Sequence, residues 1–271
     1  MLPARLLRHL LILIPLVATA AVASALSAAA PAAAQSSVNY VALGDSYSSG
    51  VGAGNYSGGS CDQSANAYSA LWAKANAPAS YVTKACSGAT TSSVISSQLS
   101  ALSASTTLVS ITVGGNDVGF SSVMETCVIF STSSCVSAID TAENKVAGDL
   151  PAELNSVLGD IAADAPNARV VVLDYPDFYD LSKSSGCIGL STTDRTDLNQ
   201  GAGELDAAIQ AAAARYGDVF ADVRAAFAGH EICDSNSWLN SVDWLDLGDS
   251  YHPTASGQAD AYLPVFSANA G

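Results

Sequence analysis

The chain has 271 residues, of which 25 are acidic and 10 are basic, giving a net charge of −15 at neutral pH. A phosphate-binding surface needs the opposite sign, so neither nucleic acid nor an anionic membrane is an expected partner. Hydrophobic residues make up 49% of the chain, and a chain of this length can bury the core of one large domain.

The N-terminus has the pattern of a secretory signal peptide. Arg5 and Arg8 form a positive start, residues 10–22 form an apolar run, and Ala32-Ala33-Ala34 offers the small residues that a signal peptidase needs. The run is shorter than the ~20 residues of a bilayer span, which argues against a transmembrane anchor. We therefore expect Sec-type export and removal of residues 1–34, which carry both arginines and no acid, so that the net charge becomes −17.

Beyond the signal, five segments have the apolar, β-branched composition of buried strands, namely residues 38–43, 81–86, 107–113, 169–176 and 218–223. Helix-like spacing of Ala, Leu and Glu lies between them at residues 65–75, 145–163, 194–216 and 254–263. The Ser/Thr-rich stretches 87–105 and 130–137 are interpreted as polar loops and helix surfaces. Alternating strands and helices predict an α/β domain over residues 35–271, with a parallel sheet covered on both faces.

Six cysteines follow the signal: Cys61, Cys86, Cys127, Cys135, Cys187 and Cys233. An even number in an exported chain predicts three disulfides, although six cysteines can pair in 15 ways. Pairing in sequence order gives three modest loops, so we expect Cys61–Cys86, Cys127–Cys135 and Cys187–Cys233. The chain has no CxxC pair or Cys/His cluster, which argues against a zinc site, and no cofactor or metal is expected.

Two polar residues and one glycine follow the carboxyl ends of predicted strands, which is where parallel sheets bind their ligands. Ser46 lies in Gly44-Asp45-Ser46-Tyr47, Gly88 follows the second strand, and Asn116 lies in Gly114-Gly115-Asn116-Asp117. A serine hydroxyl becomes a nucleophile when a base takes its proton, and an asparagine amide on a glycine turn can donate to an oxyanion. Residue 48 is serine, so the context is not the GxSxG elbow of α/β-hydrolases.

The base must be one of the three histidines of the chain. His9 leaves with the signal and His230 lies near a predicted disulfide, whereas His252 closes the string Asp249-Ser-Tyr-His252. A carboxylate beside a histidine can hold its tautomer and stabilise the imidazolium. We therefore expect His252 to be the base with Asp249 as its partner and a pKa at or above the ordinary ~6.5. His230 is expected to be structural or to face the substrate.

Together, the Ser46 string, Gly88, the Asn116 string and Asp249-x-x-His252 resemble the four blocks of the GDSL, or SGNH, hydrolases, and they occur in the same order. With the six cysteines, the chain resembles the secreted bacterial lipases and esterases of that family. Tyr47 stands where many members have Leu. The resemblance implies a three-layer α/β/α sandwich with a flavodoxin-like parallel sheet.

The resemblance also implies the site. It assigns Ser46 as nucleophile, His252 as base and Asp249 as the group that orients it, although some relatives use a backbone carbonyl in place of the acid. It assigns the oxyanion hole to the backbone amides of Ser46 and Gly88 and the side chain of Asn116.

The expected function is a secreted serine carboxylic-ester hydrolase, a lipase or esterase, that cleaves acyl esters through an acyl-enzyme. A carbohydrate deacetylase or phospholipase would use the same chemistry, and a non-catalytic secreted binding module is the alternative from another class. The expected partner is a small-molecule or lipid ester, bound by a monomer without a stable membrane anchor. Phe120, Phe178 and Tyr179 are interpreted either as the lining of an acyl groove or as core residues.

Overall fold

A five-stranded parallel sheet forms the centre of the computed structural model, which describes residues 37–183, 189–244 and 247–271. The strands are β1 (Asn39–Gly44), β2 (Ser80–Thr83), β3 (Leu108–Thr112), β4 (Arg169–Leu173) and β5 (Val219–Ala221). Their spatial order is β2-β1-β3-β4-β5, and all neighbours run parallel. This is the flavodoxin-like order, in which successive strands are added outward in opposite directions from β1 and from β3, and a crevice forms between these two strands at their carboxyl ends. The five predicted strands are confirmed.

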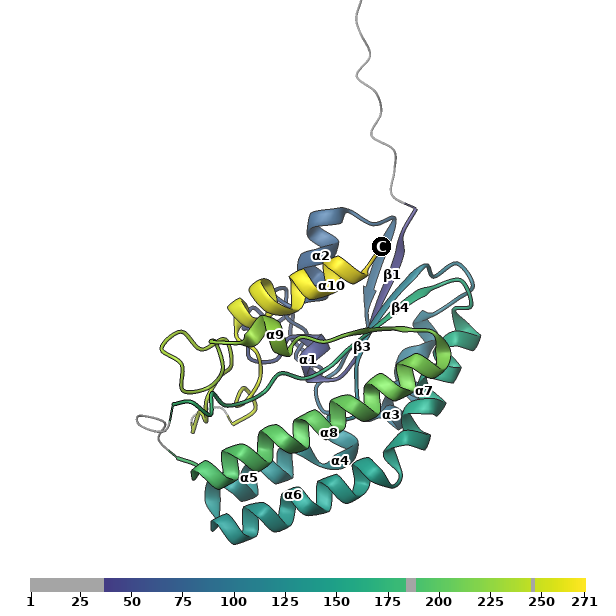
Figure 1. The fold of residues 1–271 in the computed structure, drawn as a ribbon. Helices are drawn as coiled ribbons and strands as arrows, with labels where there is room; N and C mark the ends of the chain where they lie inside the picture. The colour runs from purple at the N-terminus through teal and green to yellow at the C-terminus, as the bar shows by residue number, and fades with distance from the viewer. Residues whose placement is uncertain (1–36, 184–188, 245–246) are drawn as a thin grey trace, which may run out of the picture. The chain divides into compact units, whose positions relative to one another are not determined.

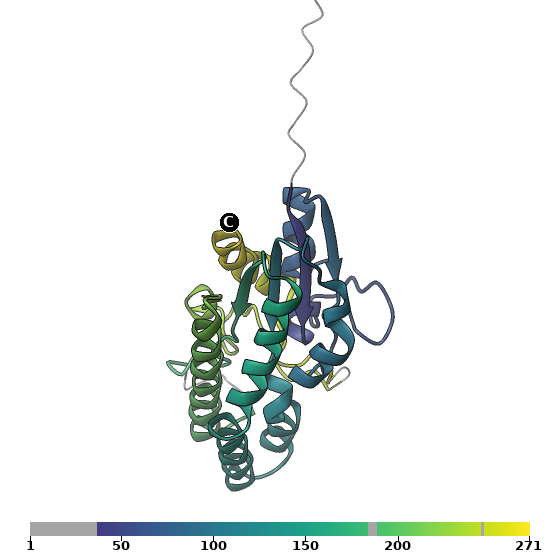
Figure 2. The same cartoon turned by 90° about the vertical axis from the view of Figure 1, so that its right-hand side faces the viewer.

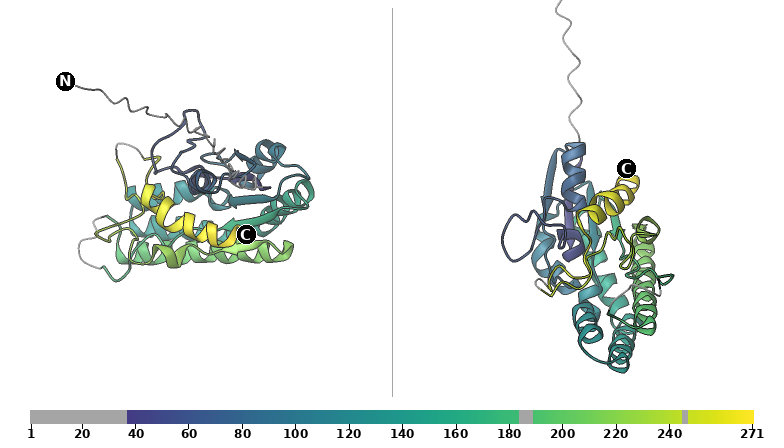
Figure 3. Two further views of the ribbon diagram at one scale, coloured as in Figure 1. Left: turned by 90° about the horizontal axis from the view of Figure 1, so that it is seen from above. Right: turned by 90° about the vertical axis from the view of Figure 1, so that its left-hand side faces the viewer.

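The helices cover both faces of the sheet. They are α1 (Ser46–Ser49), α2 (Tyr68–Asn76), α3 (Thr91–Ser93), α4 (Gly115–Val118), α5 (Phe120–Ile129), α6 (Thr132–Ala147), α7 (Leu150–Asp164), α8 (Thr192–Tyr216), α9 (Arg224–Phe227) and α10 (Leu263–Asn269), with single turns η1 (Val94–Gln98), η2 (Leu99–Ala101) and η3 (Gly257–Tyr262). One layer contains α2, η3 and α10, and the other contains α3, α7 and α8 (Figures 1 and 3).

The central strands are buried because helices cover them on both sides. Every residue of β3 is buried, and Tyr40 of β1 packs between Trp72 of α2 and Phe266 of α10. On the other face, α7 contributes the buried side chains Leu154 and Leu158. The result is the predicted three-layer α/β/α sandwich.

One predicted helix is two helices in the structure. Residues 145–163 are divided at Gly148, whose amide donates to the carbonyl of Asn144 and ends α6. Pro151 then lies in the first turn of α7, where a missing N–H costs nothing. The stretch 130–137, interpreted as loop and helix surface, contains the start of α6, because the Ser131 side chain accepts from the amide of Ser134 as an N-cap.

Helices α5 and α6 were not predicted as a pair, yet they decide the shape of the site. They pack against each other and α6 packs against α8, which extends this layer past the carboxyl ends of the strands (Figures 1 and 2). Residues 120–135 mix Ser and Thr with apolar residues, so no clear helical spacing marked these two helices in the sequence. Some of their apolar side chains line a cavity instead of packing in the core.

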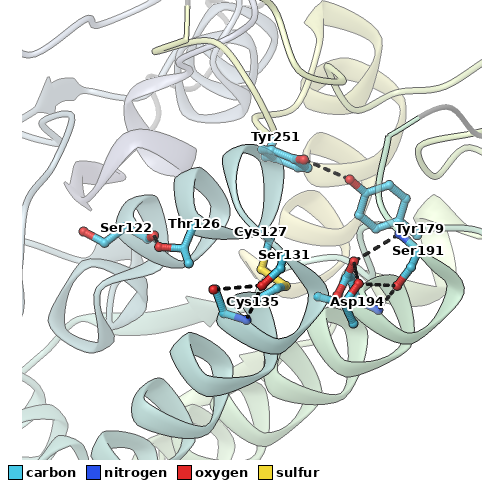
Figure 4. The surroundings of a disulfide bond; sticks show 11 residues. Ser122, Thr126, Cys127, Ser131, Cys135, Tyr179, Ser191, Asp194 and Tyr251 are labelled. Atoms are coloured by element: carbon cyan, nitrogen blue, oxygen red, sulfur yellow. Dashed lines mark hydrogen bonds between the residues drawn. A yellow bond between two sulfur atoms is a disulfide. The ribbon is translucent and has the colours of Figure 1, made fainter.

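Two of the predicted disulfides are confirmed. Cys61–Cys86 fixes the segment before Gly88, and Cys127–Cys135 joins the end of α5 to the start of α6 (Figure 4). Cys187 lies outside the described residues, so the pair Cys187–Cys233 stays a prediction. Closing a loop of ~15 residues stabilises a fold by about 3 kcal/mol, so these bonds help to hold two segments that border the site.

Candidate active site

Ser46 begins α1, immediately beyond the carboxyl end of β1. The chain can turn there because Gly44 adopts φ +117, and a side chain at Gly44 would collide with the backbone of Thr112. Asp45 caps the helix by accepting from the amide of Tyr47 at 3.0 Å. The switch point between β1 and β3 therefore carries Ser46 at the N-terminus of a helical turn.

Asp45 is a buried carboxylate that ties this turn to its neighbours. Its Oδ1 accepts from Thr112 Oγ1 at 2.6 Å, and its Oδ2 accepts from the hydroxyl of Tyr175. Tyr175 in turn accepts from the amide of Gly115 at 3.2 Å. Burial raises the pKa of Asp45 to about 6, against the effect of these donors. The Ser46 turn and the Gly115 turn are thus held together through one tyrosine.

His252 meets Ser46 as predicted, with Nε2 at 2.7 Å from Ser46 Oγ. The residue is partly exposed, but protein surrounds its ring closely, and this desolvation lowers the pKa of His252 to about 4. The negative charge of Asp249 opposes the shift without cancelling it. The expected pKa at or above ~6.5 is therefore wrong, because burial outweighs the neighbouring charge.

Asp249 does not hold the ring of His252 by a hydrogen bond. Its Oδ1 accepts from the hydroxyl of Tyr56 at 2.8 Å and from the amide of Gly52 at 3.3 Å. His252 Nδ1 is buried without a hydrogen-bond partner in the described part of the chain. The backbone of Ser250 lies close enough to favour the charged ring but not in hydrogen-bond geometry. The structure thus brings Ser46 and His252 together, whereas the Asp249 side chain bonds to Tyr56 and Gly52 and so anchors the loop that carries His252.

The histidine loop, residues 247–253, is anchored by residues for which no anchoring role was predicted from the sequence. The Tyr47 hydroxyl donates to the carbonyl of Tyr251 at 2.7 Å, and Asn240 Nδ2 donates to the carbonyl of His252 at 3.0 Å. Gly52 has φ +82, and a side chain there would meet His252 Cβ at 2.9 Å. Tyr47 could have been noticed from its place beside Ser46, whereas no sequence signal marks Asn240.

Three groups that can donate hydrogen bonds, the amides of Ser46 and Gly88 and the side chain of Asn116, belong to residues that line the same cavity as His252. Neither the amide of Ser46 nor that of Gly88 donates to another group among the described residues. Asn116 Nδ2 donates to the carbonyl of Ala89 at 3.0 Å, which orients its amide and leaves its second N–H free to donate. The Asp117 side chain stabilises the segment that follows Gly88, since it accepts hydrogen bonds from the amide and the hydroxyl of Thr91 at 3.0 and 2.7 Å.

A cavity of about 410 Å³ opens beside these groups and is lined by Ser46, Gly88, Asn116 and His252. Its deeper wall is apolar and comes mainly from α5, α6 and α8, with Val123, Met124, Val128, Ile139, Val146, Leu198, Ala202 and Leu205. Phe120 and Phe178 stack at 5.2 Å between ring centres and also line it. Tyr179 does not; its buried hydroxyl bonds to that of Tyr251 at 2.9 Å.

His230 is not among the residues that line this cavity. Its ring stacks on Trp238 with 3.6 Å between ring centres, and its Nδ1 bonds to the carbonyl of Asn236 at 2.8 Å. Of the two alternatives for His230, these contacts favour the structural one.

The model of the GDSL-like lipase/acylhydrolase family matches residues 42–259, most of the chain. The chain belongs to this family. Lipase 1 of Streptomyces coelicolor is 52% identical over 241 residues, which cover 88% of each protein. The family's chemistry makes the chain a serine ester hydrolase, in agreement with the sequence analysis.

Solved structures of similar proteins agree with this membership. Phospholipase A1 from Streptomyces albidoflavus NA297 is 51% identical, with a TM-score of 0.84 over 86% of this chain and 99% of that one. The extracellular lipase from Streptomyces rimosus is 46% identical, with a TM-score of 0.83 over the same shares of the two chains. The fold of this chain therefore matches that of a phospholipase A1 and of an extracellular lipase.

Proposed function

We propose that Ser46 and His252 act as a catalytic dyad on acyl esters of lipids. The observation that carries the proposal is the 2.7 Å contact between His252 Nε2 and Ser46 Oγ in the wall of a largely apolar cavity. His252 takes the hydroxyl proton while Ser46 Oγ forms a bond to the ester carbonyl carbon. The protonated ring then gives this proton to the leaving alkoxide as the ester C–O bond breaks, which leaves an acyl-enzyme.

Water completes the cycle by the same steps. His252 takes a proton from water as the water oxygen bonds to the acyl carbon, and Ser46 Oγ leaves and regains its proton from the ring. In both halves the carbonyl oxygen carries negative charge near the transition state. The amides of Ser46 and Gly88 and the side chain of Asn116 are the donors assigned to it, and one such donor is typically worth ~10²–10³ in rate.

The dyad is proposed to work without a hydrogen-bonded acid. The Asp249 charge favours the imidazolium from a distance, and the Asp249 carboxylate instead braces the histidine loop through Tyr56 and Gly52. Ring orientation then depends on the packing and backbone of residues 248–252. Asp249 is therefore assigned a positioning role, which revises the role that the family resemblance implied.

The substrate is proposed to be an ester with a long acyl chain. A cavity of about 410 Å³ falls in the range of small-molecule sites, and its deep wall offers apolar side chains to a hydrocarbon chain. An acetyl group would leave most of that apolar surface exposed to water, which argues against the carbohydrate deacetylase alternative. The names of the relatives, a lipase and a phospholipase A1, also favour lipid esters.

Export of the mature enzyme remains part of the proposal. Disulfides form in oxidising compartments, and one similar solved protein is an extracellular lipase. In the part of the chain that the structure describes, no helix could cross a membrane. Sequencing the N-terminus of the protein recovered from culture medium tests removal of residues 1–34, with Gln35 as the expected first residue.

Labelling with a fluorophosphonate tests the chemistry. Intact mass and peptide mapping should place one adduct on Ser46, and labelling should abolish hydrolysis of a chromogenic acyl ester. A non-catalytic binding module would give neither result. A rate profile over esters of increasing acyl length should rise beyond acetyl, and a maximum at acetyl would overturn the lipid assignment.

A further inference from the structure

The mouth of the cavity is bordered by exposed apolar side chains. Trp244, Phe130, Leu247 and Ile129 are 66%, 64%, 57% and 51% exposed, and we call these four residues the apolar rim. Trp244, Leu247 and Ile129 line the cavity and are mostly exposed, so they lie where the cavity meets solvent, and Phe130 follows Ile129 at the end of α5. The rim therefore borders the opening through which an ester would reach Ser46.

Such a group is unusual on a protein surface. Among the described residues, eight large apolar side chains are clearly exposed, and four of them belong to the apolar rim. Apolar residues scattered singly need no explanation, but a gathered patch marks a surface that another apolar phase or partner covers. Its position at the cavity mouth links that covering phase to the substrate.

The rim is held outward by rigid connections. Cys127 and Cys135 flank Ile129 and Phe130 in the sequence, and Figure 4 shows their disulfide beside the cap residue Ser131. Thr132 Oγ1, next in the chain, donates to Asp194 Oδ2 of α8 at 3.1 Å. The disulfide, the cap and this bond fix the α5–α6 connection, so Phe130 is kept in water rather than turned into the core.

Charge restricts what can cover the rim. The chain beyond residue 34 has a net charge of −17, and the cavity lining contains Glu125 and Glu143 but no lysine or arginine. A surface with net negative charge would be repelled, whereas one with no net charge would not. We propose that the apolar rim inserts into the surface of a zwitterionic phospholipid aggregate, so that an ester passes from the lipid layer directly into the cavity. This proposal rests on the proposed function.

Binding can be separated from turnover with Ser46→Ala, using sedimentation with phosphatidylcholine vesicles. Full burial of one phenylalanine changes a partition coefficient by about tenfold or more, so adding Phe130→Ser should weaken vesicle binding by about tenfold. Val82→Ser is the matched control, because Val82 is also exposed but lies on the edge strand β2 outside the cavity lining. It should bind like the parent, and vesicles made half anionic should bind less than neutral ones.

Trp244 supplies an independent readout of insertion. Its emission should shift to the blue when phosphatidylcholine vesicles are added, because an exposed indole enters an apolar phase, and Trp244→Phe should abolish the shift. Trp244→Ser should weaken sedimentation at least as much as Phe130→Ser does. No shift, or equal binding of the Phe130→Ser and Val82→Ser proteins, would overturn the proposal.

Turnover is then compared in proteins that keep Ser46. Phe130→Ser should hydrolyse a soluble short-chain ester at the parental rate, because Phe130 does not line the cavity, but should hydrolyse vesicle lipid about tenfold more slowly. Equal loss on both substrates would overturn the proposal, as would a dimer that Phe130→Ser converts to monomer without any binding to vesicles. If Ser46→Ala retains activity, the proposed function fails, whatever the vesicle result.

Discussion

The hydroxyl of Tyr47 donates a 2.7 Å hydrogen bond to the backbone carbonyl of Tyr251. These residues directly follow Ser46 and directly precede His252, so one bond joins the segments of the proposed nucleophile and base. Tyr251 has φ +67, a left-handed conformation that costs a residue with a side chain roughly 1–2 kcal/mol. The surroundings must hold it there, and the backbone of Tyr251 is bonded both to the Tyr47 hydroxyl and, through its amide, to the carbonyl of Asn240 at 2.9 Å.

Tyr47→Phe should therefore lower kcat with little change in KM. A displacement of about 1 Å in the reacting groups can cost ~10² in rate, and the carbonyl of Tyr251 would be left without its donor. Tyr262→Phe is the matched control, since this buried hydroxyl donates to the carbonyl of Asp174 at 2.8 Å. Both variants should lose stability in thermal unfolding, but only Tyr47→Phe should lose kcat. Equal kcat in the two proteins would show that the Tyr47 bond is merely structural.

Ser46→Ala and His252→Ala should each reduce kcat by roughly 10⁶, because a nucleophile and its base act as one unit. His230→Ala should keep most activity, since this ring stacks on Trp238 away from the cavity. Steady-state rates and circular dichroism of the three proteins check this. An active His252→Ala protein beside an inactive His230→Ala protein would reverse the assignment of the base.

Asn116→Ala should lower kcat by ~10²–10³ and leave KM nearly unchanged, because its amide meets full negative charge only near the transition state. The variant also loses the bond to the carbonyl of Ala89. An Asn116→Asp protein loses the same bond and the same oxyanion donor but keeps the side-chain shape, so it separates the loss of the N–H donors from the loss of side-chain volume. Both should be slow. A raised KM with normal kcat would instead make Asn116 a residue of substrate binding.

Sequence patterns predicted the elements that depend on local composition and on strand order. Ser46, Gly88 and Asn116 converge because each follows the carboxyl end of a parallel strand or the loop after it, which is a property of the topology. The contact between Asp249 and His252 was inferred from adjacency in the chain. Adjacency does not fix where a side chain points, and Tyr56 and Gly52 take the carboxylate instead.

The cavity could not be predicted for a related reason. Its wall combines α5 and α6 with α8, which comes after α7 and β4 in the sequence, so the three helices meet only after the sheet has formed. An apolar residue that faces a cavity has the same helical spacing as one that faces a core, so Leu198 or Ile139 gives no separate signal. Phe178 and Tyr179 show the limit: they are neighbours in sequence, yet only Phe178 lines the cavity.

The acid limit of activity follows from the burial of His252. The base must be neutral, and burial lowers its pKa to about 4, so kcat/KM should persist well below the ordinary histidine value of ~6.5 and fall as the pH drops through about 4. Between these two values the unfolded chain binds a proton that the folded ring rejects. The free energy of unfolding should therefore also decrease as the pH falls through that window.

Asp249→Asn separates the charge of this residue from its anchoring bonds. Removing the charge should move the acid limb of kcat/KM to still lower pH, because that charge raises the pKa of His252. The loss of kcat should stay far below the ~10⁴ seen when a hydrogen-bonded triad acid is replaced, since the carboxylate does not contact the ring. Tyr56→Phe is the control: it removes a donor to Asp249 but keeps the charge, so the acid limb should stay in place. A 10⁴-fold loss in Asp249→Asn would restore the triad and contradict the dyad.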